Sequence, residues 1–140
     1  MAVLDLSLEI DRLNEPRPDV VVVRAVHYRR SPVPVEDALL AVEVYSPSAQ
    51  SRDIVEKSHV YAAVGIPRYW MIDQLSDPIR LTEKVLDPAT RTYRDGVTTT
   101  ERFETTERFE TTEPWPIVLD LPALTARRDA LLERAKPTDE

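Results

Sequence analysis

The sequence predicts an α/β domain built on a mixed β-sheet that is flanked by helices. Three observations predict this class: a continuous β-branched run in DVVVVRA, a second apolar strand in ALLAVEVY, and a helical segment followed directly by the strand RYWMID. A strand, helix, strand order favours parallel pairing, because parallel strands need a crossover connection. At 140 residues the chain has the usual length of one domain, so we expect residues 1–140 to form a single unit with a frayed tail at 136–140.

The first half of the chain contains two predicted strand regions, a loop, a strand and a helix. VLDLSLEI alternates apolar and polar residues, which is the period of a half-buried strand. DVVVVRA is apolar throughout, which is typical of a strand covered on both faces. The loop SPVPVED leads to a strand at 38–45, and the segment at 46–66 becomes helical after several turn residues. Gly65 stands at the expected helix C-cap, and Pro67 prevents continuation.

The second half predicts strands and a final helix. RYWMID at 68–73 and IRLTEKVL at 79–86 are strands, and TYRDGVTT is a hairpin in which Asp95-Gly96 forms the turn. Residues 121–135 form a helix with Asp120 near its start and Pro122 in the first turn. The hexapeptide TTERFE occurs twice and is followed by a third TTE, over residues 99–113. Two copies are too few for a solenoid, so we interpret this segment as a local duplication that lengthens a loop or an edge strand.

Composition and charge limit the function. With no Cys there is no disulfide and no sulfur-bound zinc, and the two His are too few for a His-based metal site. No apolar run reaches about 20 residues and no signal peptide is recognisable, so we expect a cytoplasmic protein. The net charge is -7, whereas a protein that binds nucleic acid by counterion release is expected to be basic. A local arginine patch can still meet phosphate, and the candidates are Arg24, Arg29, Arg30 and Arg52.

Glu43 interrupts a strand that is otherwise apolar, LLAVEVY. Burying an unpaired carboxylate costs several kcal/mol, a large part of the stability of a small domain. Such a residue therefore has an interaction partner or a function, unless the strand lies at a sheet edge where the carboxylate reaches water.

Asp19 and Lys57 are the residues with which Glu43 could form a functional site. If the strands that carry Asp19 and Glu43 are neighbours, both carboxylates can bind one hard cation, Mg2+ or Mn2+. Lys57 lies on the following helix, from which an ammonium group can point back to the same place. A metal, two carboxylates and a lysine suit phosphodiester hydrolysis. The alternatives are that Asp19 is a turn residue after Pro18, and that Lys57 forms a surface ion pair with Asp53, worth about 0.3–0.5 kcal/mol.

A family resemblance agrees with this set. RPDVVVV, followed by LLAVEVYSPSAQSRDIVEKSHVYAAVGIPRYWMID, resembles the Uma-two family of restriction-endonuclease-like proteins, in the PD-(D/E)xK nuclease superfamily. The likeness covers about residues 17–73 and continues more weakly to PWPIVLDLPAL. It implies a restriction-endonuclease-like core and a Mg2+-dependent nuclease site. In that site Asp19 and Glu43 match the motif carboxylates, and Lys57 matches the relocated motif lysine. Tyr45 stands where the superfamily often has that lysine, Arg17 stands where Gln is common, and the family's N-terminal helix and hairpin have no counterpart before VLDLSLEI.

Three functions are consistent with these observations. The leading hypothesis is a Mg2+-dependent endonuclease that hydrolyses DNA, in which Asp19 and Glu43 bind the metal and Lys57 orients the attacking water. The alternative is a truncated, catalytically inactive nuclease-fold protein that acts as an interaction module. A third hypothesis is an acidic homodimer that binds no nucleic acid and pairs through the TTERFE strand.

Overall fold

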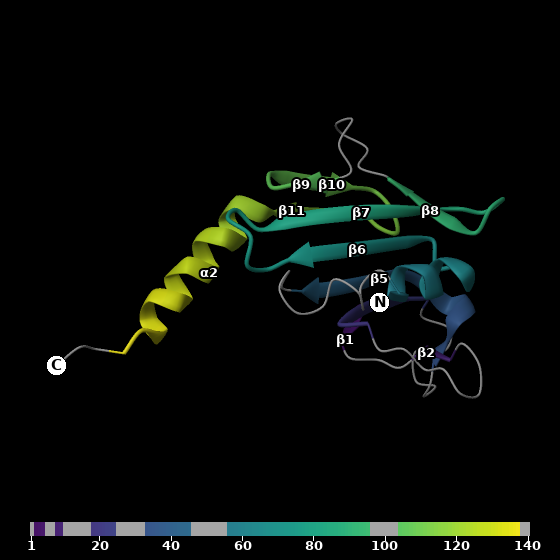
Figure 1. Cartoon of the computed structure of the whole chain (residues 1–140), viewed down its shortest axis with the longest axis horizontal. Helices are drawn as coiled ribbons and strands as arrows, with labels where there is room; N and C mark the ends of the chain where they lie inside the picture. The colour runs from purple at the N-terminus through teal and green to yellow at the C-terminus, as the bar shows by residue number, and fades with distance from the viewer. Residues whose placement is uncertain are drawn as a thin grey trace.

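The computed structural model describes residues 2–4, 8–9, 18–24, 33–45, 56–95 and 104–137. Its centre is a seven-stranded sheet in the order β1-β3-β5-β6-β7-β8, with β9 pairing along part of β7 (Figure 1). These strands are β1 (Ala2–Leu4), β3 (Val20–Val23), β5 (Ala38–Tyr45), β6 (Arg68–Asp73), β7 (Arg80–Asp87), β8 (Thr92–Asp95) and β9 (Glu104–Thr105). β5 and β6 run parallel and the other pairs of this sheet are antiparallel, so the predicted α/β class with a mixed sheet is confirmed.

Further elements surround the sheet. They are β2 (Leu8–Glu9), β4 (Val33–Pro34), the short 3-10 helix η2 (Val35–Asp37), a helix at residues 56–63, β10 (Arg108–Thr111), β11 (Ile117–Asp120) and α2 (Leu121–Ala135). β10 and β11 form an antiparallel hairpin, and β2 pairs β4 in parallel. In none of the helices that the structure describes is there a stretch long and apolar enough to cross a membrane.

The predicted boundaries differ from the structure mainly near the N-terminus. β5, β6 and α2 begin and end at the predicted residues. The single strand predicted for VLDLSLEI is wrong: β1 pairs β3 in the main sheet, whereas β2 pairs β4 in a separate one. Alternation alone does not tell which partner a strand will find. The predicted turn at Asp95-Gly96 lies partly outside the described residues.

The helix at 56–63 ends as its sequence predicts. Gly65 has a φ of 87°, a left-handed conformation that favours glycine. The Gly65 N–H donates to the Ala62 carbonyl at 3.1 Å, and the Ile66 N–H donates to the Tyr61 carbonyl at 3.1 Å. This pair of bonds is the Schellman ending, which returns the chain to the sheet at Arg68.

The helix covers one face of the sheet, which we call the helix face. Its core is formed by buried residues of β3, β5 and β6 and by the helix itself: Val21, Val23, Ala38, Ala41, Tyr61, Ile66 and Tyr69. Three tyrosine rings run across it. The Tyr61 and Tyr69 rings meet edge to face with centroids 5.3 Å apart, and the Tyr69 and Tyr93 rings stack at 5.9 Å. Aromatic pairs of this kind stabilise a core by about 0.5–1.5 kcal/mol beyond the area they bury.

The opposite face, which we call the hairpin face, is covered by the β10–β11 hairpin and the start of α2. Its buried residues are Val22, Leu40, Val42, Trp70, Ile79, Leu81, Phe109 and Leu121. The Phe109 ring packs edge to face on Trp70 with centroids 5.4 Å apart. Phe109 belongs to the second TTERFE copy, whose residues 105–110 supply the end of β9, a bend and β10.

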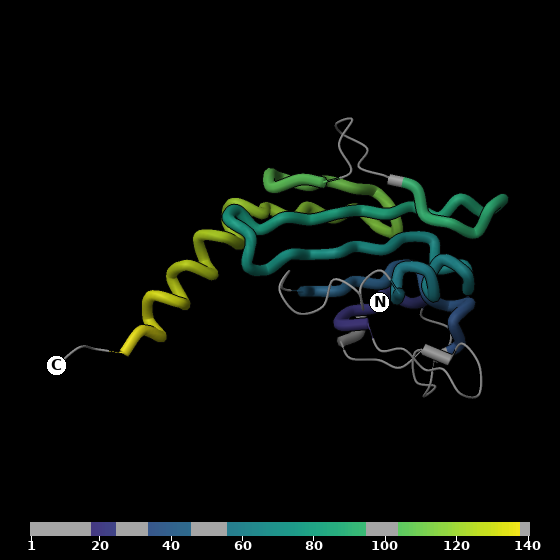
Figure 2. Tube along the Cα trace, viewed as in Figure 1, coloured from purple at the N-terminus to yellow at the C-terminus, as the bar shows by residue number. Residues whose placement is uncertain are grey.

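α2 extends from the end of the sheet at which β5 and β6 finish (Figures 1 and 2). Asp120 caps it, since its Oδ1 accepts a hydrogen bond from the Ala123 N–H at 3.0 Å. Thr125 accepts from the Ile79 N–H at 2.9 Å, and Arg128 donates to the Gln74 carbonyl at 2.8 Å. The first turns of α2 are therefore fixed to the β6–β7 connection, while the later turns are exposed.

The hairpin face contains a buried carboxylate, Glu83. Glu83 of β7 has no exposed surface, and its Oε2 accepts hydrogen bonds from Trp70 Nε1 at 3.0 Å and Arg68 Nη1 at 3.3 Å. Its Oε1 is buried and has no hydrogen-bond partner among the described residues. Burial raises the pKa of Glu83, and the bonds from Trp70 and Arg68 oppose that rise.

Replacing Glu83 by Gln removes this titrating group at almost constant volume. Because its pKa is raised, the folded chain holds the proton of Glu83 more tightly than the unfolded chain does. The stabilisation from this group is complete below about pH 4.5 and is lost as the pH rises through the folded pKa. We expect the free energy of unfolding, measured by urea denaturation, to fall less steeply with rising pH in Glu83→Gln than in the wild type.

Glu110→Gln is the matched control, since the Glu110 side chain is 56% exposed. The free energy of unfolding of this variant should depend on pH as that of the wild type does. If Glu83→Gln also kept it, the assigned titration of Glu83 would be wrong.

Candidate active site

Glu43 lies in the middle of the sheet. β5 is paired by β3 on one side and by β6 on the other, and the Glu43 residue is only 5% exposed. The alternative of a solvated carboxylate on an edge strand is therefore wrong. Glu43 points to the helix face, two residues after the buried Ala41 of that face.

Two donors from the helix meet one oxygen of Glu43. Lys57 Nζ lies 3.3 Å from Glu43 Oε1, and the Tyr61 hydroxyl donates to the same oxygen at 2.9 Å. Lys57 and Tyr61 are four residues apart, so they share one side of the helix. Asp53, the alternative partner of Lys57, lies outside the described residues.

Asp19 is brought to Glu43 by strand pairing. β3 runs antiparallel to β5 with Val20 opposite Val42, which places Asp19 beside Glu43. Asp19 Oδ2 accepts a hydrogen bond from the Val44 N–H at 2.7 Å. A turn residue of this type would bond to backbone within a few positions, whereas Asp19 bonds across 25 residues to the next strand. The structure thus brings Asp19, Glu43 and Lys57 together.

The electrostatics of the site are dominated by the burial of Glu43. Burial raises the pKa of Glu43, the Tyr61 hydrogen bond and the Lys57 charge lower it, and the negative charge of Asp19 raises it again. Burial, followed by the Glu43 charge, also raises the pKa of the Tyr61 hydroxyl. Tyr61 therefore keeps its proton and acts as a donor to the carboxylate.

The donors that hold Glu43 and Asp19 leave one oxygen of each carboxylate for a ligand. In the part of the chain that the structure describes, no hydrogen bond goes to Glu43 Oε2 or Asp19 Oδ1. No group of three Asp, Glu, His or Cys side chains suitable for a metal is found among the described residues. A pair of carboxylates fits Mg2+, which usually keeps several waters and binds through one or two carboxylates plus substrate phosphate.

Tyr61 is the site residue that the sequence analysis did not propose. Its position on the inward side of the helix was consistent with a core aromatic. The signal that could have indicated a role in the site was its spacing of four residues from Lys57, which puts the Tyr61 hydroxyl on the same side of the helix as the ammonium group. Whether the hydroxyl reaches a carboxylate depends on how the helix docks on β5.

Of the predicted arginine patch, Arg24 is the member that lies within the described residues. Arg24 lies at the opposite end of β3 from Asp19, and its Nη1 donates to the Glu36 carbonyl at 3.1 Å. The other three members of the proposed patch, Arg29, Arg30 and Arg52, lie outside the described residues. The described chain places no arginine of that patch beside Glu43.

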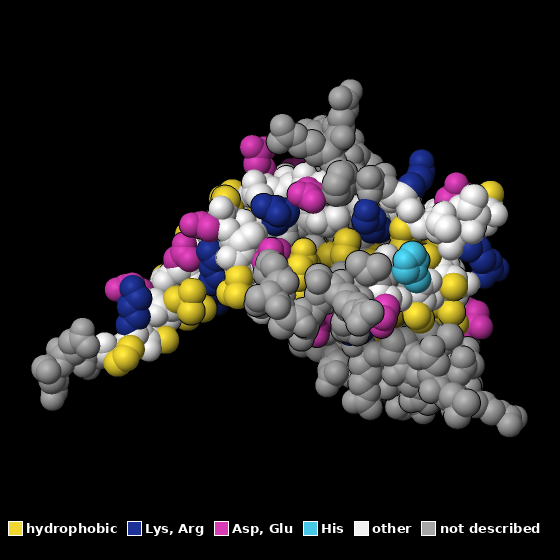
Figure 3. Space-filling view, in the orientation of Figure 1, with side chains coloured by type: hydrophobic (Ala, Val, Ile, Leu, Met, Phe, Trp, Pro, Cys, Tyr) yellow, Lys and Arg dark blue, Asp and Glu magenta, His cyan; other side chains and the backbone are white. Residues whose placement is uncertain are grey.

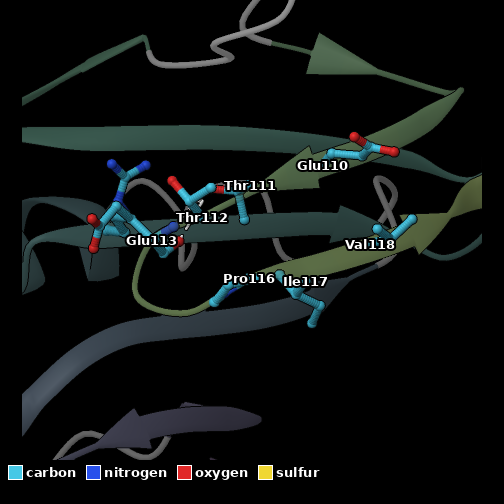
Figure 4. A pocket seen from close by; sticks show the side chains of 8 residues that line it. Glu110, Thr111, Thr112, Glu113, Pro116, Ile117 and Val118 are labelled. Atoms are coloured by element: carbon cyan, nitrogen blue, oxygen red, sulfur yellow. Dashed lines mark hydrogen bonds between the residues drawn. The ribbon is translucent and has the colours of Figure 1, made fainter.

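A cavity lined by described residues lies away from this site. It has a volume of about 590 Å³ and is lined by Arg68 and by the β10–β11 hairpin, at Glu110, Thr111, Thr112, Glu113, Pro116, Ile117 and Val118 (Figure 4). It contains none of the three predicted site residues. The carboxylates instead lie towards the carboxyl end of β5, beside the start of β3.

The architecture and the comparisons agree on the class of protein. A mixed sheet with these flanking helices is consistent with the restriction-endonuclease-like fold. The family model Uma2, described as "Putative restriction endonuclease", matches residues 1–127 of the 140. The chain belongs to the Uma2 family, and that description supports a nuclease acting on nucleic acid. No curated protein matches the sequence significantly.

Replacing Glu43 by Gln tests whether this carboxylate is present for stability. Since burial opposes its charge and the amide oxygen can still accept from Tyr61 and Lys57, we expect Glu43→Gln to unfold with a free energy equal to the wild type or about 1 kcal/mol higher. Urea denaturation at pH 7–8 measures this difference.

Lys57→Met provides the contrast, because it leaves the buried charge with one donor fewer. It should lower the free energy of unfolding by about 1 kcal/mol or more. A large destabilisation by Glu43→Gln would contradict this account, since it would make the carboxylate itself a structural group.

Proposed function

We propose that the protein is a Mg2+-dependent endonuclease that hydrolyses phosphodiester bonds of DNA, with Mn2+ able to replace Mg2+. The observation that carries this proposal is the convergence of Asp19, Glu43 and Lys57 at one end of the neighbouring strands β3 and β5. The Uma2 family match supports the reaction class.

The metal would be held by Glu43 through Oε2 and by Asp19 through Oδ1. Bound there, a divalent cation polarises a phosphoryl oxygen and lowers the pKa of a coordinated water. Glu43 is suited to this role because both of its protein donors bond Oε1, which fixes the plane of the carboxylate. Asp19 is oriented in the same manner by the Val44 N–H.

Lys57 would orient the attacking water and offset negative charge that develops on the phosphate. Its side chain is 28% exposed, so the ammonium group is anchored on Glu43 and still reachable by substrate. An ammonium placed where charge develops stabilises the transition state more than the ground state. Tyr61 would hold Glu43 without touching substrate, which makes it a positioning residue.

Cleavage of plasmid DNA in the presence of Mg2+ or Mn2+ tests the proposal. We expect activity that is abolished by chelator and reduced at least about 100-fold by Glu43→Gln or Asp19→Asn, because each removes a metal ligand. Lys57→Met should lower kcat more than it raises KM, since its role lies in the transition state.

The exposed carboxylate Glu110 again provides the control, and Glu110→Gln should cleave like the wild type. Cleavage by Glu43→Gln at the wild-type rate would overturn the assignment of the site and point to a contaminating nuclease.

Calorimetric titration with Mn2+ tests the metal site without relying on activity. We expect binding by the wild type that is weakened about 10-fold or more in Tyr61→Phe, because residues that orient a metal ligand commonly affect affinity by that amount. Tyr93→Phe is the matched control: its ring lies in the same aromatic row, but its hydroxyl donates to the Ile66 carbonyl at 2.9 Å.

Equal losses in Tyr61→Phe and Tyr93→Phe would mean that the hydroxyls act only through the core. A wild-type protein that bound no Mn2+ at millimolar concentration would instead favour the inactive interaction module.

A further inference from the structure

A second cavity lies on the helix face, between the helix at 56–63 and the strands β7 and β8. Its volume is about 170 Å³, and the described residues that line it are Ser58, His59, Ala62, Lys84, Arg91, Thr92 and Tyr93. None of these seven is acidic, and two are cations, of which Lys84 lies opposite Asp95 in the pairing of β7 with β8. In a chain with a net charge of -7 this is an unusual local balance. The larger cavity on the hairpin face combines Arg68 with Glu110 and Glu113, so it lacks this positive character.

The groups that line the smaller cavity are suited to an oxyanion. Lys84 and Arg91 supply positive charge, and Ser58 and Thr92 supply hydroxyl donors. Arg91 Nη1 donates to the Ala63 carbonyl at 3.1 Å, which fixes one end of the guanidinium at the rim. A guanidinium has five N–H donors, so this bond leaves several for a ligand.

Arg91 occupies a backbone position that normally favours another residue. It ends the β7–β8 turn with a φ of 53°, a left-handed conformation in which glycine or asparagine is usual. An arginine there costs conformational energy that glycine would avoid. The Arg91 N–H donates to the Asp87 carbonyl at 2.9 Å, which holds this turn, and the side-chain bond to the Ala63 carbonyl occupies one donor of the guanidinium.

The cavity lies on the same sheet face as the candidate active site. Register pairs Ala41 with Tyr69 and Tyr69 with Lys84, so Lys84 is two strands across from β5 and two residues along from Glu43. Strand spacing and rise then separate the Cα atoms of Lys84 and Glu43 by about 12 Å. This separation is short enough for one nucleic-acid strand to contact both places, since its phosphates recur every few ångströms along the duplex axis. In the space-filling view, Lys and Arg side chains lie on either side of the His side chain drawn on this face (Figure 3).

We propose that the cavity between the helix at 56–63 and the β7–β8 hairpin binds a phosphate group of the nucleic-acid backbone, a few nucleotides from the bond that is cut. The proposal rests on the proposed nuclease function. It adds a substrate-binding site formed by Arg91 and Lys84.

Binding of a fluorescently labelled DNA duplex in metal-free buffer, followed by anisotropy across a range of NaCl concentrations, tests this. We expect Arg91→Gln to weaken binding about 10-fold and to lower the slope of log K against log salt by about one, because one phosphate contact is lost. Arg91→Gly should weaken binding equally while the chain stays folded, since glycine suits the left-handed backbone.

Arg94→Gln is the matched control. Arg94 is exposed on β8, the strand that follows Arg91. It pairs with Val85, so its side chain points to the opposite face from Tyr93. Equal losses in Arg91→Gln and Arg94→Gln would overturn the proposal, because charge alone would then explain them. Metal-dependent cleavage with unchanged DNA binding by Arg91→Gln would overturn this inference and leave the nuclease function standing.

Titration with inorganic phosphate separates the two sources of the anion. If the wild type bound phosphate through Arg91 and bound no DNA, the ligand would be a free anion and the nucleic-acid assignment would fall. If it bound neither, the site itself would be overturned.

Discussion

The hydrogen-bonded ion pair between Glu43 and the helix at 56–63 is the constraint on which this structure depends. A carboxylate in the central strand of a sheet is costly unless donors reach it, and here both donors come from one turn of one helix. The helix must therefore dock on β5 at one position. The row of tyrosine rings from Tyr61 to Tyr93, and the bond from the Tyr93 hydroxyl to the Ile66 carbonyl, fix that position from the other side of the helix. The same docking position of the helix therefore determines both the packing of the core and the geometry of the site.

Glu43 and Glu83, two of the buried carboxylates of the sheet, differ in the surroundings that decide between a structural and a chemical role. Glu83 is enclosed on the hairpin face, and its donors Trp70 and Arg68 come from the neighbouring strand. Glu43 is buried near the end of its strand, beside Asp19, with a partly exposed lysine as one donor. Burial raises the pKa of both, yet of the two only Glu43 has a second carboxylate beside it and a partly exposed lysine as a donor. We therefore place the candidate chemistry at Glu43 and a structural role at Glu83.

An acidic chain can still receive an anionic polymer if its positive charge is local. The candidate active site carries two carboxylates that a divalent cation would offset, and Lys57 contributes a further positive charge. On the same face, Lys84 and Arg91 line a cavity without acidic neighbours among its described walls. The net charge of -7 averages over these regions and hides them.

The sequence by itself determined the local elements and the residues that call for explanation. Apolar runs and end signals located β5, β6 and α2 to the residue, and the Gly65 ending followed from a single glycine before a proline. Glu43 was recognisable because a carboxylate in an apolar run is costly wherever that strand lies. Only the tertiary structure decided what surrounds it. Asp19 reaches β5 across 25 residues and Tyr61 reaches Glu43 across 18, so both contacts depend on strand order and helix docking, which periodicity does not encode. The burial of Glu83 and the basic cavity at Arg91 were equally invisible, because they arise where separate segments pack against each other.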